Sequence, residues 1–206
     1  MKKLIVILMV LFVVSCKRSE KKPSATEIKK ELIITEVAIP SYIAWGNQRA
    51  NLEEVPSDNT KGEVFRISRN TIAASSFAHT QDISINFEST YRVSVSVKAT
   101  ELNSFFGLRI VGGYPDRADA IFDLKEGTLI GVKIARDFRN PDATIEAMGD
   151  GWYKCSLTAE PYSESIKILF GPTAAGKAIL GWEGLVDKKN DIFILPSSLT
   201  LEEIKL

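Results

Sequence analysis

Hydrophobic and polar residues alternate with a period of two along most of the chain after residue 39. The clearest example is the segment 91–98, in which Tyr91 and three valines alternate with Arg92, two serines and Lys98. Successive side chains of a strand point to opposite faces, so this segment predicts a half-buried strand with its polar face in water. The same pattern predicts eight further strands, over residues 64–67, 83–87, 105–111, 120–124, 129–134, 152–158, 165–170 and 191–195.

Turn-forming residues separate these segments, and no stretch after residue 39 has the period of a long amphipathic helix. The turn signals are rich in Gly, Pro, Asn and Asp and lie at residues 56–59, 112–113, 125–127, 140–142, 149–151 and 171–172. Many short strands without helices predict an all-β fold, because two sheets can bury their inner faces against each other. We therefore expect a two-sheet antiparallel β-sandwich of the jelly-roll type, formed by a single domain over residues 39–206.

The N-terminus has the layout of a cleaved export signal. Two lysines precede an apolar run over residues 4–14, which is shorter than the about 20 residues that a membrane-spanning helix needs. The following Val-Val-Ser-Cys at 13–16 resembles the lipobox of bacterial lipoproteins, which implies a signal peptide over residues 1–15 and a lipid on the Cys16 sulfur. An ordinary secretory signal or a short anchor is the alternative. Lys17 offers no inner-membrane retention aspartate, so we expect an outer-membrane lipoprotein, on its periplasmic or cell-surface side.

Residues 16–38 are predicted to be a linker between the lipid and the domain. Ser24 and Glu27 have the spacing of a helix capping box, whereas the β-branched run over 32–37 favours entry into a first strand. From Leu32 onward the chain carries 18 Lys and Arg against 23 Asp and Glu. A mildly acidic domain lacks the basic face that a nucleic-acid partner requires, so we expect no nucleic-acid binding.

Cys155 has no partner once Cys16 carries a lipid, so no internal disulfide is expected. Cys155 alternates with Tyr153 and Leu157, which predicts a small apolar residue packed inside a strand rather than a reactive thiol. The adjacent Trp152 is interpreted in the same way, as a core residue at the strand entrance.

Two other motifs suggest enzymatic chemistry and fail on inspection. The segment 171–177 ends in Gly-Lys like a phosphate-binding loop, but Ala178 stands where the magnesium-binding Ser or Thr belongs and no convincing helix follows. A turn between strands is the preferred interpretation. His79 is the only histidine, which excludes a metal site built on histidine pairs, and we expect it in an exposed turn.

The acidic residues give no catalytic pattern either. Glycan hydrolases on jelly rolls use two carboxylates that face one another, and the Glu-x-Asp-x-x-Glu arrangement is absent. Asp116, Asp119 and Asp123 form the densest acidic group and are candidate ligands of a structural Ca²⁺. Arg117 lies among them, so a solvated loop and strand edge is the preferred interpretation, and no cofactor is expected. We expect a protein that is not an enzyme.

A longer pattern carries a resemblance to a family. A strand that ends in Lys98-Ala99 is followed by Phe122-Asp-Leu with Gly127-Thr128, and then by Gly-Trp-Tyr-Lys-Cys at 151–155. This order resembles carbohydrate-binding-module-like jelly rolls of bacterial surface proteins and phage tail and head-fibre proteins, over roughly residues 40–196. The chain departs from that family at 191–196, where Asp-Ile-Phe-Ile-Leu-Pro replaces its terminal Trp-Gly-Ala-Gln-Leu-Glu strand. The resemblance implies a jelly roll with a non-catalytic binding role, and it carries over no ligand residues.

Aromatic residues in or beside loops are the candidate ligand contacts. Exposed aromatic rings stack on the apolar faces of sugars, while neighbouring polar side chains bind the hydroxyls. The candidate aromatics are Tyr42, Trp45, Tyr114, Tyr162 and Trp182, and the candidate polar partners are Asn47, Gln48, Arg49 and Arg109. From these we select Trp45, Tyr114 and Trp182, with Arg109 and Asn47, as the expected site.

The expected function is that of a membrane-anchored lipoprotein that binds glycan or another cell-envelope polymer. Glycan binding predicts that at least two of Trp45, Tyr114 and Trp182 are exposed within one concave patch. A structural lipoprotein that docks another protein is the alternative and predicts a broad apolar patch. A glycan lyase or hydrolase is the least favoured class and predicts two close carboxylates in a cleft.

Overall fold

The computed structural model describes residues 32–56, 62–87 and 89–205, and those from Leu32 onward form one compact unit. The predicted signal peptide, Cys16 and the linker before residue 32 lie outside the described residues. Within the described part of the chain, no helix is long and apolar enough to cross a membrane.

Fourteen strands and two short 3₁₀ turns make up the described regular structure. One sheet has the order β11-β12-β7-β14-β4-β3, with β1 also paired to β14; the other has the order β10-β9-β8-β13-β5-β2, with β6 paired to β13. The strands are β1 Ile33–Val37, β2 Gly46–Gln48, β3 Ala50–Val55, β4 Val64–Arg69, β5 Phe77–His79, β6 Ile83–Ser84, β7 Thr90–Lys98, β8 Phe105–Val111, β9 Arg117–Asp123, β10 Thr128–Ala135, β11 Arg139–Gly149, β12 Trp152–Glu160, β13 Ser165–Pro172 and β14 Asp191–Lys205; the turns are η1 Tyr42–Ala44 and η2 Ile179–Gly181.

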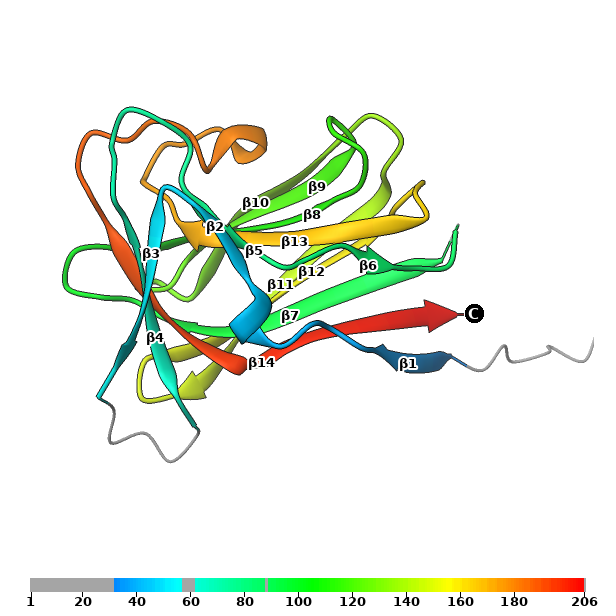
Figure 1. Ribbon diagram of the computed structural model, residues 1–206, viewed down its shortest axis with the longest axis horizontal. Helices are drawn as coiled ribbons and strands as arrows, with labels where there is room; N and C mark the ends of the chain where they lie inside the picture. The colour runs from blue at the N-terminus through cyan, green and yellow to red at the C-terminus, as the bar shows by residue number, and fades with distance from the viewer. Residues whose placement is uncertain (1–31, 57–61, 88, 206) are drawn as a thin grey trace, which may run out of the picture. The chain divides into compact units, whose positions relative to one another are not determined.

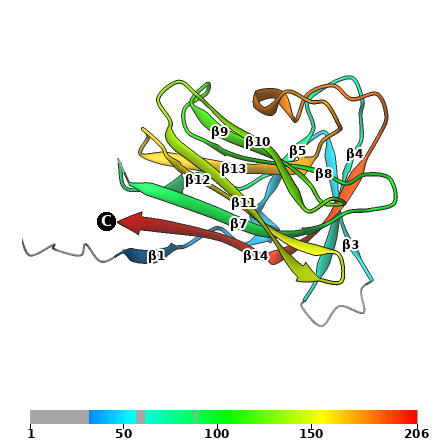
Figure 2. The ribbon, with the colours of Figure 1, turned by 180° about the vertical axis from the view of Figure 1, so that it is seen from behind.

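All strand pairs are antiparallel, and the two sheets lie face to face (Figures 1 and 2). The central order β4-β14-β7-β12 in one sheet faces β5-β13-β8-β9 in the other, and the chain changes sheet between β7 and β8 and again before β13 and β14. This connectivity is that of a jelly roll, to which β10, paired with β9, and β11, paired with β12, each add an edge strand, one in each sheet. The predicted two-sheet antiparallel sandwich is confirmed.

The core fills the space between the sheets, as the alternating pattern predicts. Tyr91 and the three valines of β7 are fully buried and belong to the same core cluster as Phe106, Leu108 and Ile110 of β8. The rings of Phe106 and Phe122 stack with their centres 6.1 Å apart. Burial of apolar side chains from both sheets is the main contribution to folding here.

Two further core predictions are confirmed. Cys155 is fully buried, and desolvation by this burial raises the pKa of its thiol well above the ordinary value, which makes thiolate chemistry unfavourable. Trp152 is also buried, in a small cluster with Val64 and Leu195 at the entrance of its strand. Both residues serve packing.

The polar face of β7 differs from the prediction. Ser94 and Ser96 are buried rather than in water. Residues 196–199 of β14 bulge out of register between Leu195 and Thr200, and Ser198 accepts a 2.8 Å hydrogen bond from the backbone N–H of Ser96. Ser94 and Ser156 share a 2.8 Å hydrogen bond between their hydroxyls. Small hydroxyl side chains therefore allow this outer face to be covered without unpaired polar groups.

Several boundaries also differ. The turn predicted at 140–142 lies inside β11, where Asn140 has a positive φ of 45° and the register shifts between Arg139 and Asp142. An edge strand tolerates Pro141 because one side of its backbone has no partner strand. The strand predicted over 83–87 is only β6, of two residues. β1 pairs with β14 over its whole length, so the sheet includes part of the segment expected as linker.

The structure predicts that Phe106 is essential to the core. Phe106→Ala should lower the free energy of unfolding by about 3–5 kcal/mol, because it opens a cavity between the sheets. The exposed Ile130, on β10, is the matched control, and Ile130→Ala should change stability by less than about 0.5 kcal/mol. Urea denaturation of both variants measures the difference, and equal midpoints for the two would contradict the assignment of the core.

Candidate functional site

The aromatic residues selected from the sequence do not form one patch. Trp182 is fully buried, and Trp45 is partly buried with its ring edge against Phe170, at 4.8 Å between ring centres. Tyr114 alone of the three is well exposed, at 79%. Asn47 is exposed on β2, which is the edge strand opposite β10 in its sheet. The expected platform of exposed aromatic side chains is therefore wrong.

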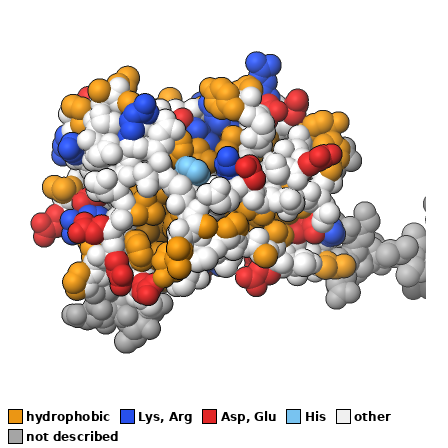
Figure 3. Space-filling view, viewed as in Figure 1, with side chains coloured by type: hydrophobic (Ala, Val, Ile, Leu, Met, Phe, Trp, Pro, Cys, Tyr) orange, Lys and Arg blue, Asp and Glu red, His pale blue; other side chains and the backbone are white. Residues whose placement is uncertain are grey.

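The surface also lacks one dominant apolar area on the face seen in Figure 3, where hydrophobic side chains form several groups separated by charged and polar ones. Exposed large apolar residues come from many elements, including Ile43, Leu102, Ile130 and Leu185. Single exposed apolar residues of this kind are ordinary on a soluble surface.

Arg109 points away from the core, as predicted, but it is buried under the loop that joins β13 to β14. Its Nε donates a 2.6 Å hydrogen bond to Asp119, and its two terminal nitrogens bind Glu183 of this loop at 2.9 and 2.8 Å. Its guanidinium lies 5.6 Å from the centre of the Trp182 ring. Arg109 is therefore engaged on all sides and is not a surface ligand contact, which corrects the prediction.

A glycine and several arginines hold the β13–β14 loop, residues 173–190, against the outer face of the sheet that contains β8. A Cβ at Gly107 would overlap the Trp182 ring, so only glycine leaves room for the indole there. Arg69 donates to the backbone carbonyls of Glu183 and Gly184, and Arg117 donates to that of Leu180 at 2.8 Å. The loop is thus held by charge-assisted hydrogen bonds, which are stronger than neutral ones.

Two of the three acids considered for calcium have other side-chain partners. Asp119 is fully buried between Arg109 and Arg117, whereas Asp123 accepts hydrogen bonds from the backbone N–H groups of Lys125 and Glu126. Across the described residues, no group of three or more metal-binding side chains comes together. The acidic group expected from the sequence is therefore divided between an ion cluster and a turn.

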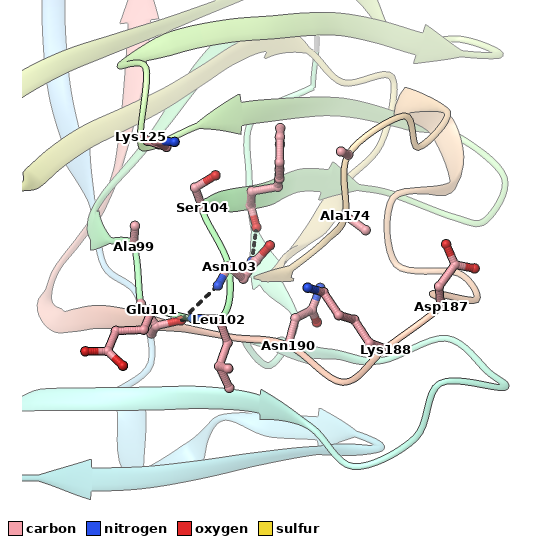
Figure 4. Close-up of a pocket in the computed structure, with 13 residues that line it drawn as sticks. Ala99, Glu101, Leu102, Asn103, Ser104, Lys125, Ala174, Asp187, Lys188 and Asn190 are labelled. Carbon is pink, nitrogen blue, oxygen red and sulfur yellow. Dashed lines mark hydrogen bonds between the residues drawn. The ribbon is translucent and has the colours of Figure 1, made fainter.

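A concave pocket of about 660 Å³ lies at one end of the sandwich. Its walls come from the β7–β8 loop, the β9–β10 turn and the β13–β14 loop (Figure 4). We call this the loop-end pocket. It is lined by residues 99–105 and by Lys125, Ala174, Ala175, Asp187, Lys188 and Asn190.

Thr100 orders the wall formed by the β7–β8 loop. Its hydroxyl donates to Asp191 at 2.6 Å and accepts from the backbone N–H groups of Leu102 and Asn103 at 3.2 Å each. The Asn103 side chain donates to the carbonyl of Phe105 at 2.8 Å. This turn therefore presents Leu102, which is 62% exposed, in a fixed position at the pocket rim.

The charged side chains of the pocket differ in direction. In Figure 4, Lys188 extends toward Asn190, and Lys125 stands at the opposite wall, while the carboxylates of Glu101 and Asp187 point outward. Asn190 is nearly fully buried, and its side-chain amide donates to the backbone carbonyl of Thr173 at 2.6 Å. Its side-chain carbonyl oxygen has no hydrogen-bond partner among the described residues. The pocket thus combines apolar walls with ammonium groups and amides.

The structure also places the two other sequence motifs. The segment 171–177 ends β13 and continues as a loop into the pocket wall at Ala174, which confirms the interpretation as a turn. The short η2 turn that follows is not a phosphate-binding helix. His79 lies in β5 rather than in an exposed turn; its Nδ1–H donates to the Thr80 carbonyl at 2.8 Å, and its ring occupies the space beside Gly46.

No protein-family model matches this chain, and no curated protein matches it. The sequence gives no signal for the loop-end pocket, because the residues that line the pocket come from three separate loops and include no aromatic side chain except Phe105. Function is therefore inferred from the geometry of the pocket.

The buried ion cluster predicts a pH dependence of stability. Burial raises the pKa of Asp119 to about 6, while Arg109 and Arg117 act in the opposite direction. A carboxyl whose folded pKa exceeds its unfolded value of 3.8 stabilises the fold most below pH 4, and this contribution is lost as pH rises through 6. Between pH 4.5 and 6, wild type should lose stability relative to Asp119→Asn, by at most about 1.4 kcal/mol per pH unit.

Urea denaturation of both proteins across this pH range measures the slope. A wild-type advantage that grows with pH would contradict the assignment. Direct NMR titration of the Asp119 carboxyl in wild type provides a second measurement that does not depend on the folding of the variant.

Proposed function

We propose that this chain is a non-catalytic, lipid-anchored protein of the cell envelope that binds glycan or a related envelope polymer in the loop-end pocket. The observation that carries the proposal is the pocket itself, which is concave, partly apolar and supplied with several polar groups. Leu102 and Ala174 offer apolar contacts for the faces of a sugar, and Lys188, Asn103 and the backbone offer hydrogen bonds to its hydroxyls.

The position of the pocket within the domain supports a role in tethered binding. Ile33, where β1 begins, pairs with Lys205, and the neighbouring Ile204 pairs with Thr90 at the start of β7. The β7–β8 loop follows the other end of β7, which has nine residues and therefore spans roughly 30 Å. β1 begins at one end of the sandwich, and the β7–β8 and β13–β14 loops that line the pocket lie at the other (Figure 1).

The direction of the pocket carboxylates favours binding over hydrolysis. Glu101 and Asp187 are exposed and point away from the pocket in Figure 4, so they do not face each other across a bound sugar. A glycosidase mechanism needs two carboxyl groups about 5–9 Å apart on either side of the bond.

A protein-docking role is the second candidate, and one observation favours it. β1 is an edge strand whose Ile33 and Ile34 are exposed at 57% and 46%. Exposed apolar edge strands are suited to pairing with a strand from another chain.

A glycan array tests the leading proposal. Mature protein with Cys16→Ser should bind at least one class of envelope or dietary polysaccharide. Leu102→Ala should weaken that binding by about tenfold, through loss of buried apolar contact. Ile43→Ala is the matched control, because Ile43 is exposed at 84% and lies outside the pocket, and it should leave binding unchanged. An array without any signal would favour the docking role.

Fractionation of cells tests the anchor separately. Wild type should be recovered with the outer membrane and should carry lipid on Cys16 by mass spectrometry, because the lipobox resemblance implies acylation there. Cys16→Ser should be recovered in the soluble fraction or as an uncleaved precursor. Recovery of an unmodified mature chain from wild-type cells would overturn the lipoprotein assignment.

A further inference from the structure

Two aromatic side chains form an exposed pair at the end of the sandwich opposite the loop-end pocket. Phe87 lies just before β7, and Tyr162 lies in the β12–β13 loop. Their rings meet in a T-shaped arrangement with centres 4.3 Å apart. They remain 45% and 48% exposed. Each ring therefore keeps a large apolar surface in contact with water although it is packed against the other.

Hydrogen bonds fix both segments that carry the pair. The backbone N–H of Ile85 donates to the Glu164 carbonyl at 3.0 Å, which joins the two segments directly. Asn86 donates its backbone N–H to the Tyr91 hydroxyl at 2.7 Å and its side-chain amide to Glu203 at 2.8 Å. The aromatic pair is consequently held in place before any ligand arrives, which lowers the entropic cost of binding.

Glu203 is a stable part of this support. The Lys205 ammonium, 2.9 Å from it, lowers the pKa of Glu203 to about 2, with help from Asn86. Its carboxylate therefore remains ionised at neutral pH and continues to accept the hydrogen bonds that hold Asn86.

A second cavity, of about 260 Å³, lies beside Tyr162. Asp137, Arg139, Glu160 and Pro161 complete its lining. The Arg139 guanidinium lies 5.9 Å from the centre of the Tyr162 ring. Glu160 accepts one hydrogen bond, from the Thr90 hydroxyl at 3.2 Å, through one of its two oxygens. Two carboxylates and one guanidinium therefore line a cavity beside a partly exposed aromatic ring, with the guanidinium over that ring.

We propose that this cavity, with Tyr162 and Phe87, is a second binding site, and that it takes a neutral sugar. The apolar face of the sugar ring packs on the exposed aromatic surface. Its hydroxyls donate to Asp137 and Glu160 and accept from Arg139, which are charge-assisted hydrogen bonds.

The charge of the site selects against acidic sugars. Two carboxylates outnumber the one guanidinium that lines the cavity, so a sugar carboxylate would meet net repulsion. The loop-end pocket differs, because Lys125 and Lys188 lie on its walls. The proposal extends the glycan class of the proposed function to a separate surface, and it is tested there independently.

Saturation-transfer NMR with three neutral trisaccharides, made of β-1,4-linked glucose, α-1,4-linked glucose or mannose, detects this binding. The Cys16→Ser chain should give a signal with at least one of them. Tyr162→Ala should abolish that signal, whereas Tyr162→Phe should retain it, because the ring face is preserved. Asp137→Asn should weaken binding by about tenfold, since it removes a charged acceptor.

The trisaccharide of galacturonic acid tests the charge preference. It should bind more weakly than the neutral probe in a competition that is sensitive to Tyr162→Ala. No signal with any neutral probe, a signal that survives Tyr162→Ala in a variant with unchanged thermal stability, or tighter binding of the acidic probe would each overturn the proposal.

Leu102→Ala distinguishes this site from the loop-end pocket. It should leave the Tyr162-dependent signal unchanged, because the two sites lie at opposite ends of β7. A glycan-array signal that is lost in Leu102→Ala and kept in Tyr162→Ala, together with no trisaccharide signal, would support the pocket and overturn the second site. The reverse pattern would support the second site alone.

Discussion

Two sheets that are each apolar on one face have to bury those faces against each other, and the other features of this domain follow from that constraint. The fully buried side chains of β7, β8, β9 and β12 fill the space between the sheets. Because the strands run antiparallel across this core, their connections can lie only at the two ends of the sandwich. Loops that are far apart in the sequence therefore meet there, and both candidate sites are built from such loops.

The buried ion cluster of Arg109, Asp119 and Glu183 fixes a loop on an outer face of the sandwich. Arg109 joins Asp119 of the neighbouring strand to Glu183 of the β13–β14 loop, and Trp182 packs over it. Removing charges from water is unfavourable unless they are paired, so the cluster is stable only with the loop in place. The same loop supplies Lys188 and Asn190 to the loop-end pocket. Arg109 and Trp182, which were candidate ligand contacts in the sequence, thus instead hold in place the loop that forms a wall of the pocket.

The two ends of the domain differ in chemistry. The loop-end pocket has apolar walls with Lys125 and Lys188, and it opens away from the point at which β1 begins. The other end presents Tyr162 and Phe87 with two carboxylates and an arginine. Two such sites, as proposed, would let one domain hold a polymer at more than one point, which raises the overall affinity without new contacts at either site.

The alternation of residues 91–98 and its counterparts determined the fold class, because strand periodicity depends on local spacing that any sequence displays directly. Burial of Cys155 and Trp152 followed from the same spacing. The position of the candidate site did not follow from this spacing. Whether the Trp182 side chain points into water or packs against the sheet depends on the space left by Gly107 and on the ion pair of Arg109 with Glu183, 74 residues apart in the chain. Only the tertiary structure brings such partners together, since side-chain exposure is a property of packing between distant segments and leaves no periodic trace in the sequence.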